Sequence, residues 1–125
     1  HPAIEAAHVL EDQGISAGVV NMRFVKPLDA ELLREAAAKT KLLVTIEDNV
    51  LDGGFGSAVL EAISSNAGFA GVRVLRIGIP DRFIEHGAPH LLYESVGLTA
   101  PKIAERTAEW MGRKAAAPSA APVAA

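Results

Sequence analysis

The middle of the chain carries residues that are typical of a ligand-binding loop. A short apolar run ends at Glu47, the glycines Gly53, Gly54 and Gly56 follow, and a helical pattern begins near Ser57. A strand, a glycine loop and a helix in this order form many phosphate and cofactor sites, because the first N–H groups of the helix point at the ligand. The first question is therefore whether this loop holds an anion.

The charges near the loop argue against an anion. No lysine or arginine lies within it, and Glu47 and Asp52 surround it with negative charge that would repel a phosphate. We therefore interpret the loop as a tight corner. Gly53 and Gly54 would permit positive φ angles there, and Gly56 would let the helix pack closely against the sheet.

Two other groups at the corner have structural interpretations. Ser57 does not fit the Gly-x-Ser-x-Gly pattern of a nucleophile elbow, so we expect it to cap the helix. Glu47 and Asp48 are adjacent on a strand and point to opposite faces, which excludes a working acid–base pair. We expect Glu47 to accept hydrogen bonds from loop N–H groups or from an arginine such as Arg82. Simple solvation of its carboxylate is the alternative.

A second polar cluster follows the third apolar run, in the string PDRFIEHGAPH. His86 and His90 are four residues apart, a spacing that binds zinc on a helix, but the intervening glycine and proline disfavour a helix and no third ligand is visible. We expect Arg82 to pair with Glu85 or with Glu47. Phe83 and the following isoleucine would anchor in the core, and His86 would cap or bond a neighbouring group.

The composition indicates one folded domain and excludes several classes of protein. The chain has 125 residues, is 50% hydrophobic and carries a net charge of −3, which gives no reason to expect nucleic acid or a membrane surface as a partner. It has no cysteine, which excludes disulfides and thiol catalysis and fits a reducing compartment. The apolar runs are shorter than the roughly 18 residues of a membrane span. We expect a cytoplasmic domain.

Helical and extended patterns alternate along the chain, which predicts an α/β fold with a mostly parallel sheet. The expected helices cover residues 2–13, 28–39, 57–68, 89–97 and 100–110. The expected strands cover residues 17–25, 41–47 and 72–80. Asp29 is a plausible N-cap of the second helix, Gly14 a C-cap of the first, and Thr99 a cap of the last. From Ala115 only alanine, proline, serine and valine remain, so residues 115–125 are expected to be a disordered tail.

Three strings in the chain resemble, in order and spacing, the C-terminal domain of 1-deoxy-D-xylulose-5-phosphate synthases. They are VVNMRFVKPLD, LVTIEDNVLDGGFGSAVLE and GIPDRFIEHG. The resemblance extends from about Ala3 to about Ala104. Related transketolases and 2-oxoacid dehydrogenase β chains carry looser versions of the glycine string, whereas RFVKPLD together with PDRFIEHG is more particular to the synthases.

The resemblance implies an enzyme whose chemistry lies outside these 125 residues. The whole synthase condenses pyruvate with glyceraldehyde 3-phosphate in isoprenoid precursor (methylerythritol phosphate) and thiamine biosynthesis. It is a transferase that uses thiamine diphosphate and magnesium, both held by its first two domains. None of the motifs that bind them occurs here, so we assign no catalytic, cofactor-binding or metal-binding residue. The resemblance also implies a homodimer and contacts with the upstream domains.

The resemblance further implies a three-layer α/β/α sandwich with a five-stranded mixed sheet. Two of the five strands would precede His1, and the second of them would lie between the strands near Val19 and Val44. The domain would then cover residues 1–114 and retain three strands in this chain. The residues expected to have structural or domain-contact roles are Glu47, Gly53, Gly54, Gly56, Arg82, Glu85 and His86.

Two other functions remain open from the sequence. One is a regulatory module that binds a small anion at the strand ends near Glu47 and Arg82. The other is the C-terminal domain of a 2-oxoacid dehydrogenase β chain, which would dock a partner acyltransferase subunit. The strings RFVKPLD and FIEHG favour the synthase over the dehydrogenase.

Overall fold

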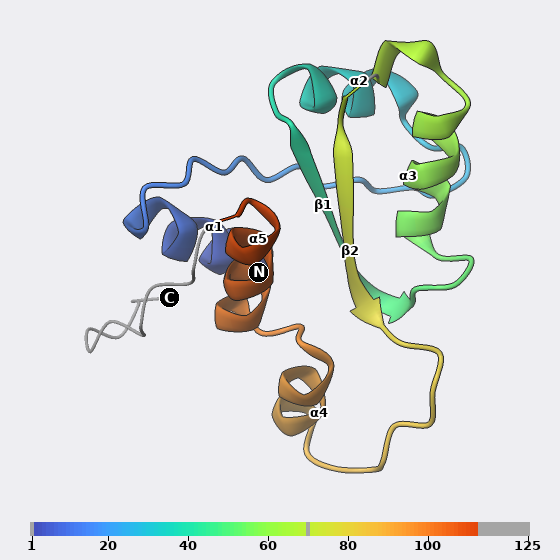
Figure 1. Cartoon of the computed structure of the whole chain (residues 1–125). Coiled ribbons are helices and arrows are strands. Elements are labelled where there is room, and N and C mark those ends of the chain that lie inside the picture. The colour runs from blue at the N-terminus through green and yellow to red at the C-terminus, as the bar shows by residue number, and fades with distance from the viewer. Residues whose placement is uncertain (1, 70, 113–125) are drawn as a thin grey trace. The chain divides into compact units, whose positions relative to one another are not determined.

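The computed structural model describes residues 2–69 and 71–112 (Figure 1). Its elements are, in chain order, α1 (Pro2–Asp12), α2 (Ala30–Ala38), β1 (Leu42–Val50), α3 (Phe55–Ser64), the 3-10 helix η1 (Ala67–Phe69), β2 (Arg73–Ile79), α4 (Pro89–Val96) and α5 (Ala100–Trp110). None of the helices in these ranges is long and apolar enough to cross a membrane. The tail expected at residues 115–125 lies outside the described residues.

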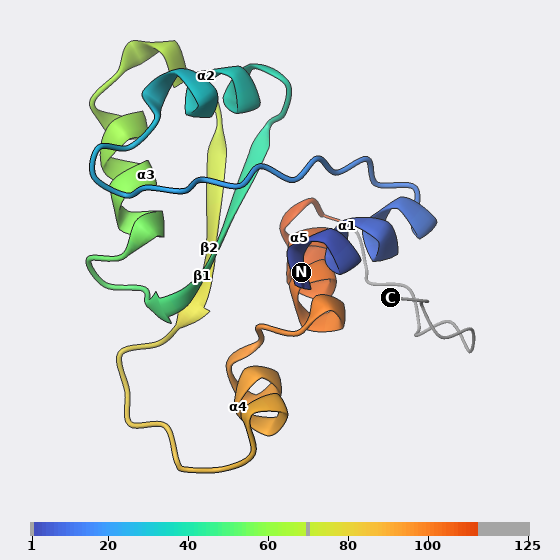
Figure 2. The same ribbon diagram turned by 180° about the vertical axis from the view of Figure 1, so that it is seen from behind.

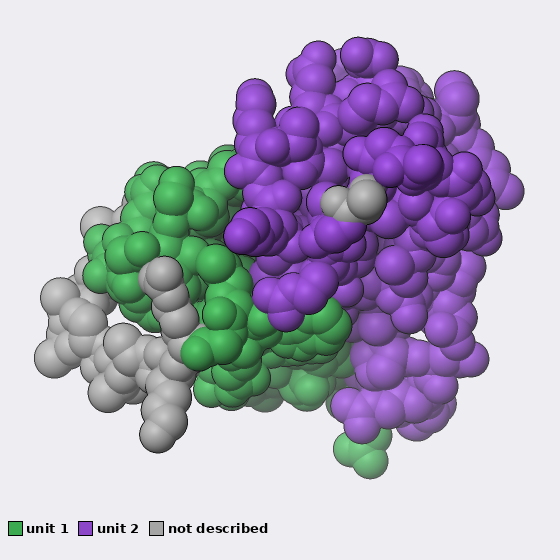
Figure 3. Space-filling view, turned by 45° about the horizontal axis from the view of Figure 1, so that its top comes forward, with its two compact units in different colours: residues 1–19, 85–125 green, residues 20–84 purple. Residues whose placement is uncertain are grey.

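The chain divides into two compact units (Figure 3). The sheet unit comprises Val20–Ile84 and contains α2, β1, α3, η1 and β2. The helical unit combines His1–Val19 with Glu85–Ala125 and contains α1, α4 and α5. The glycine corner therefore belongs wholly to the sheet unit.

The sheet unit is a β–α–β arrangement. Its strands pair in parallel, from Leu42 opposite Arg73 to Ile46 opposite Ile77. Parallel neighbours cannot be joined by a tight hairpin, and here α3 and η1 supply the crossover. The expected α/β class with a parallel sheet is confirmed.

One apolar cluster holds α2, α3 and η1 together beside the sheet (Figures 1 and 2). Its buried members are Leu33, Ala37, Val59 and Phe69. Leu43 of β1 and Met22 pack against them, so the strand, both helices and the segment before α2 share this core. The start of α2 agrees with the prediction, because Asp29 Oδ1 accepts a hydrogen bond of 3.0 Å from the N–H of Leu32.

The third expected strand does not form, and within the described residues the sheet has only two strands. Residues 17–25 are coil and turn instead, and they lead toward α2 (Figure 2). β-branched residues favour an extended chain, but a strand also needs a neighbour that pairs with its N–H and C=O groups. The family resemblance assigns that neighbour to a preceding segment, and no described residue takes its place. The strand prediction is therefore wrong for this chain.

The helical unit is built on close contact between α1 and α5. The buried residues of the two helices are mostly small: Ala6, Ala7 and Leu10 on α1, and Ala100, Ile103, Ala104, Thr107 and Ala108 on α5. Gly14 adopts φ 78° just after α1 and its N–H donates to Glu11 O at 2.9 Å, which confirms the expected C-cap. Thr99 occupies the N-cap position of α5, but its hydroxyl donates to Glu94 Oε2 at 2.9 Å instead of capping the helix.

Candidate functional site

The corner between β1 and α3 begins with an irregularity in the strand. Ile46 pairs with Ile77 and the next pair is Val50 with Ile79, so that residues 47–49 of β1 lie opposite a single residue of β2. Extra residues in one strand bend it and redirect its side chains. Glu47 is the first residue of this bulge, and it is only 8% exposed although it carries a carboxylate.

The Glu47 carboxylate lies at the N-terminus of α3. Its Oε2 accepts a hydrogen bond of 2.7 Å from the N–H of Phe55, and its Oε1 accepts one of 3.0 Å from the N–H of Gly56. The N-cap residue Gly54 has no side chain that could serve these donors. Glu47 therefore replaces the missing cap and places a negative charge at the positive end of the helix. Of the partners expected for Glu47, the loop N–H groups are confirmed.

This arrangement leaves the helix N-terminus unsuitable for an external anion. The donors that would hold a phosphate are already bonded to a buried carboxylate, which would also repel it. The described residues contain no group of three or more histidine, cysteine, aspartate or glutamate side chains placed to hold a metal ion. The corner itself therefore does not fit a diphosphate.

The glycines of the corner have different roles. Gly53 adopts φ 73°, as expected, which a side chain would strain. Gly54 has φ −86°, so the expected positive angle is wrong for it. The true constraint is space, because a Cβ on Gly54 would overlap the Glu47 carboxylate and lie 2.6 Å from Val50 O. A Cβ on Gly56 would lie 2.7 Å from Thr45 Oγ1, which confirms that Gly56 allows close packing on the sheet.

Ser57 and Arg76 form hydrogen bonds with the loop between β1 and α3. The Ser57 hydroxyl donates to Leu51 O at 2.9 Å and accepts from the N–H of Gly53 at 3.2 Å. The Arg76 guanidinium donates to Ser57 Oγ at 3.1 Å and to Leu51 O at 3.4 Å. Ser57 is not the N-cap that we expected, because α3 begins two residues earlier, at Phe55. It fastens the loop instead.

Three residues of the corner have no counterpart in the sequence-based prediction. Gly78 lies opposite the bulge, where a Cβ would come within 2.8 Å of both Glu47 Cγ and Leu51 Cδ2. Arg76 contributes from β2, and Thr45 Oγ1 is buried without a hydrogen-bond partner. A glycine inside the otherwise apolar run VRVLRIGI is the signal that could have revealed the close approach at Gly78.

The second polar cluster is open to solvent. Arg82, Glu85 and His86 have exposed side chains, and neither Arg82 nor Glu85 belongs to an ion pair in the part of the chain that the structure describes. The expected pairing of Arg82 with Glu47, which lies in the same unit, is therefore wrong, whereas its pairing with Glu85 of the other unit stays a prediction. Phe83 is 84% exposed, so its expected place in the core is wrong as well. The segment between β2 and α4 has no regular structure that could bury it.

His86 and His90 do not share a helix. His90 lies in α4, which begins at Pro89, whereas His86 precedes that helix. Because α4 begins at Pro89, His86 and His90 cannot adopt the i, i+4 arrangement on one helix that binds zinc. The two clusters thus differ, since the corner is closed by internal hydrogen bonds and the second cluster faces solvent.

Comparison with known proteins identifies the family. The family model for the C-terminal domain of transketolase matches residues 1–103. The chain is 50% identical over 115 residues to 1-deoxy-D-xylulose-5-phosphate synthase 1 of Geobacter sulfurreducens, which is 92% of this chain and 18% of that protein. It is 52% identical over 120 residues to the synthase of Desulforudis audaxviator, which is 96% of this chain and 19% of that protein.

A solved structure gives the same result at the level of the fold. The chain matches a split gene transketolase, described as an inactive β4 tetramer, with a TM-score of 0.80 and 40% identity over 90% of this chain and 36% of that one. The chain spans about a fifth of the length of the two synthases. The resemblance inferred from the motifs is confirmed, and the chain belongs to the transketolase C-terminal domain family.

Proposed function

We propose that this chain is the C-terminal structural domain of a 1-deoxy-D-xylulose-5-phosphate synthase. The whole enzyme would condense pyruvate with glyceraldehyde 3-phosphate and release carbon dioxide, for isoprenoid precursor and thiamine biosynthesis. The observation that carries the proposal is identity of 50% and 52% to two such synthases over nearly the whole chain. The lower identity of 40% to a split gene transketolase supports the synthase over a transketolase.

The role of this domain would be architectural. Thiamine diphosphate supplies the carbanion chemistry of such an enzyme, and it would be bound with magnesium by the preceding domains. The corner supports this assignment, because the carboxylate of Glu47 accepts hydrogen bonds from the N–H groups of Phe55 and Gly56 and leaves neither group available for a ligand. Glu47, Gly53, Gly54 and Gly56 would maintain the shape of the domain. Their interactions also argue against the small-anion module.

The partners would be the upstream domains and a second copy of the enzyme, as a cytoplasmic homodimer. Arg82, Glu85 and His86 are exposed and available for contacts with the upstream domains. The split gene transketolase is described as inactive and tetrameric, which is consistent with chains of this family assembling without completing the chemistry. No observation favours a dehydrogenase β chain that docks an acyltransferase.

The test uses the full-length protein that contains this chain. Purified enzyme with thiamine diphosphate and magnesium should convert pyruvate and glyceraldehyde 3-phosphate to 1-deoxy-D-xylulose 5-phosphate, measured by mass spectrometry of the product. The variant Arg82→Ala should weaken thermal stability or domain assembly more than cofactor affinity. Failure to form the product would contradict the assigned activity. A large rise in the Kd of thiamine diphosphate in a normally folded Arg82→Ala protein would contradict the architectural role.

A further inference from the structure

The loop between β1 and α3 contains a chemically reactive pair. Asp52 and Gly53 are the only Asp–Gly neighbours in the sequence, and both are exposed. An aspartate before glycine forms a cyclic succinimide more readily than one before a larger residue, because glycine has no Cβ that hinders attack by its own backbone nitrogen. A Cβ on Gly53 would meet nothing within 4 Å, so the surrounding loop leaves open space at this position.

The backbone nitrogen of Gly53 is held by Ser57. The N–H of Gly53 donates to Ser57 Oγ at 3.2 Å, and the Ser57 hydroxyl donates to Leu51 O at 2.9 Å. The Arg76 guanidinium donates to the same Ser57 oxygen at 3.1 Å. To close a succinimide ring, the Gly53 nitrogen must lose its proton and move toward the side-chain carboxyl carbon of Asp52. The hydrogen bond to Ser57 opposes both changes.

We propose that Asp52–Gly53 is a site of spontaneous aspartate isomerisation, and that Ser57 slows the reaction by holding the Gly53 nitrogen. This nitrogen forms a bond to Cγ of the protonated Asp52 carboxyl, the amide proton passes to solvent, and the carboxyl hydroxyl leaves as water. Water then opens the ring. Its addition at Cγ restores aspartate, whereas its addition at the backbone carbonyl carbon breaks the bond from that carbon to nitrogen and leaves isoaspartate. The overall change is an isomerisation that consumes no water and needs no other reactant.

Isoaspartate at position 52 would disturb the corner. It lengthens the main chain by one carbon directly before Gly53, and the residues that follow have little freedom to adjust. Even a Cβ on Gly54 would lie 2.6 Å from Val50 O, and the N–H of Phe55 is bonded to Glu47 Oε2 at 2.7 Å. The modification therefore weakens the cap that Glu47 provides for α3.

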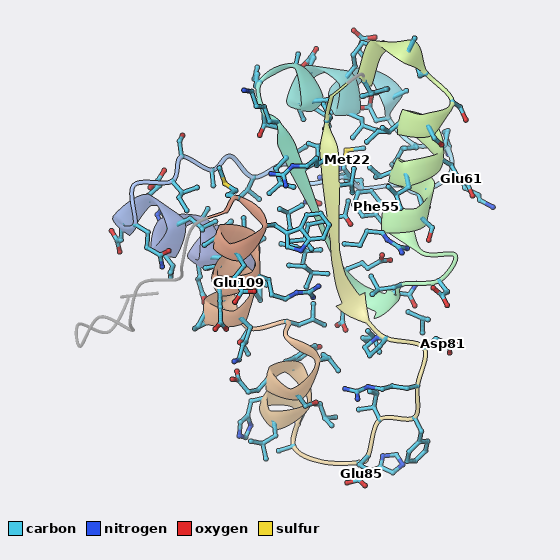
Figure 4. All side chains as sticks on the ribbon, in the orientation of Figure 1. Met22, Phe55, Glu61, Asp81, Glu85 and Glu109 are labelled. Carbon is cyan, nitrogen blue, oxygen red and sulfur yellow. The ribbon has the colours of Figure 1, made fainter. Side chains whose placement is uncertain are left out.

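Asp81 is a matched control within the same unit. It lies just beyond the end of β2 (Figure 4) and is exposed, as Asp52 is. The nitrogen of the next residue is again held, since the N–H of Arg82 donates to Pro80 O at 2.8 Å. The arginine side chain, however, hinders the attack that glycine permits. Isomerisation is therefore expected at Asp52 and not at Asp81.

Peptide mapping of the full-length protein after incubation at neutral pH tests the proposal. Electron-transfer fragmentation of the peptides distinguishes isoaspartate from aspartate at each position. The wild-type protein should accumulate isoaspartate at Asp52, and Ser57→Ala should accumulate it about tenfold faster because the Gly53 nitrogen is released. Ser57→Thr keeps the hydroxyl and should react at nearly the wild-type rate. Equal rates in the wild type and Ser57→Ala, or equal isoaspartate at Asp52 and Asp81, would overturn the proposal.

Incubation in urea supplies a measurement that does not depend on the folding of a variant. Unfolding removes the hydrogen bond to Ser57, so the wild-type rate at Asp52 should rise at least about tenfold over that of the folded protein. Wild type and Ser57→Ala should then react equally fast. An unchanged wild-type rate, a difference between the two proteins that persists in urea, or no isoaspartate at Asp52 under either condition would overturn the proposal.

Discussion

Replacing Gly54 by alanine tests the corner most sharply. The new Cβ would lie 2.6 Å from Val50 O and 2.9 Å from Glu47 Cδ, and it would overlap the carboxylate itself. Overpacking of this kind costs about 1–3 kcal/mol. Moving the carboxylate away would also weaken two hydrogen bonds to a charged group, each of which contributes about 1.5–3 kcal/mol. Because the chain can relax partly, we expect a loss of about 3 kcal/mol.

Two other glycines of the sheet unit provide matched controls. Gly53→Ala meets no atom within 4 Å but forces a side chain into φ 73°, at a cost of about 1–2 kcal/mol. Gly68→Ala meets Asn66 Oδ1 at 3.4 Å, an ordinary contact, and should change the stability by less than about 0.5 kcal/mol. All three substitutions restrict the unfolded chain alike, so differences between them report on the folded state.

Hydrogen exchange of the full-length protein, followed by mass spectrometry, measures these effects locally. A loss of about 3 kcal/mol corresponds to roughly a hundredfold faster exchange of the amides of Phe55 and Gly56 in Gly54→Ala. We expect the fastest exchange in Gly54→Ala, slower exchange in Gly53→Ala and the slowest in Gly68→Ala. If Gly54→Ala exchanged no faster than Gly68→Ala, the role assigned to the close approach of Gly54 and Glu47 would be refuted.

Two further predictions concern the side chains that surround the corner. Thr45→Val removes a buried hydroxyl that has no hydrogen-bond partner, so it should raise the free energy of unfolding by about 1 kcal/mol. Thr107→Val removes a hydrogen bond of 2.8 Å to Ile103 O and should lower the free energy of unfolding by about 1 kcal/mol. Urea unfolding measures both changes, and equal changes would contradict the different roles assigned to the two hydroxyls. Arg76→Met keeps the aliphatic stem of the side chain but loses the hydrogen bonds to Ser57 Oγ and Leu51 O. The hydrogen-exchange rate of the Gly53 amide should therefore rise about tenfold, and an unchanged rate would contradict the role of Arg76 in holding the loop.

The features that were predictable from the sequence depend on short-range geometry. Asp29 caps α2 and Gly14 ends α1 because each acts within four residues of its own position. The acids around the glycine loop also sufficed to exclude a phosphate site. These charges alone favour a structural corner over an anion site.

The features that were missed depend on residues distant in the chain. Arg76 reaches Leu51 across 25 positions, and Gly78 is required only because the bulge brings Glu47 over it. Residues 17–25 have the composition of a strand, but the pairing partner that a strand needs is not encoded in the same window. Phe83 is apolar and was therefore expected inside, although burial depends on which surfaces are available to cover it.

The central claim is that this domain stabilises the enzyme without touching its cofactor, and Glu47→Gln in the full-length protein tests it most directly. The substitution keeps the size of the side chain but directs an amide NH2 group at one of the two backbone donors. Titration calorimetry with thiamine diphosphate and magnesium measures the Kd for the cofactor, and thermal unfolding measures the Tm of the protein. The account predicts a lower Tm with an unchanged Kd for the cofactor. A Kd raised tenfold or more at an unchanged Tm would contradict it.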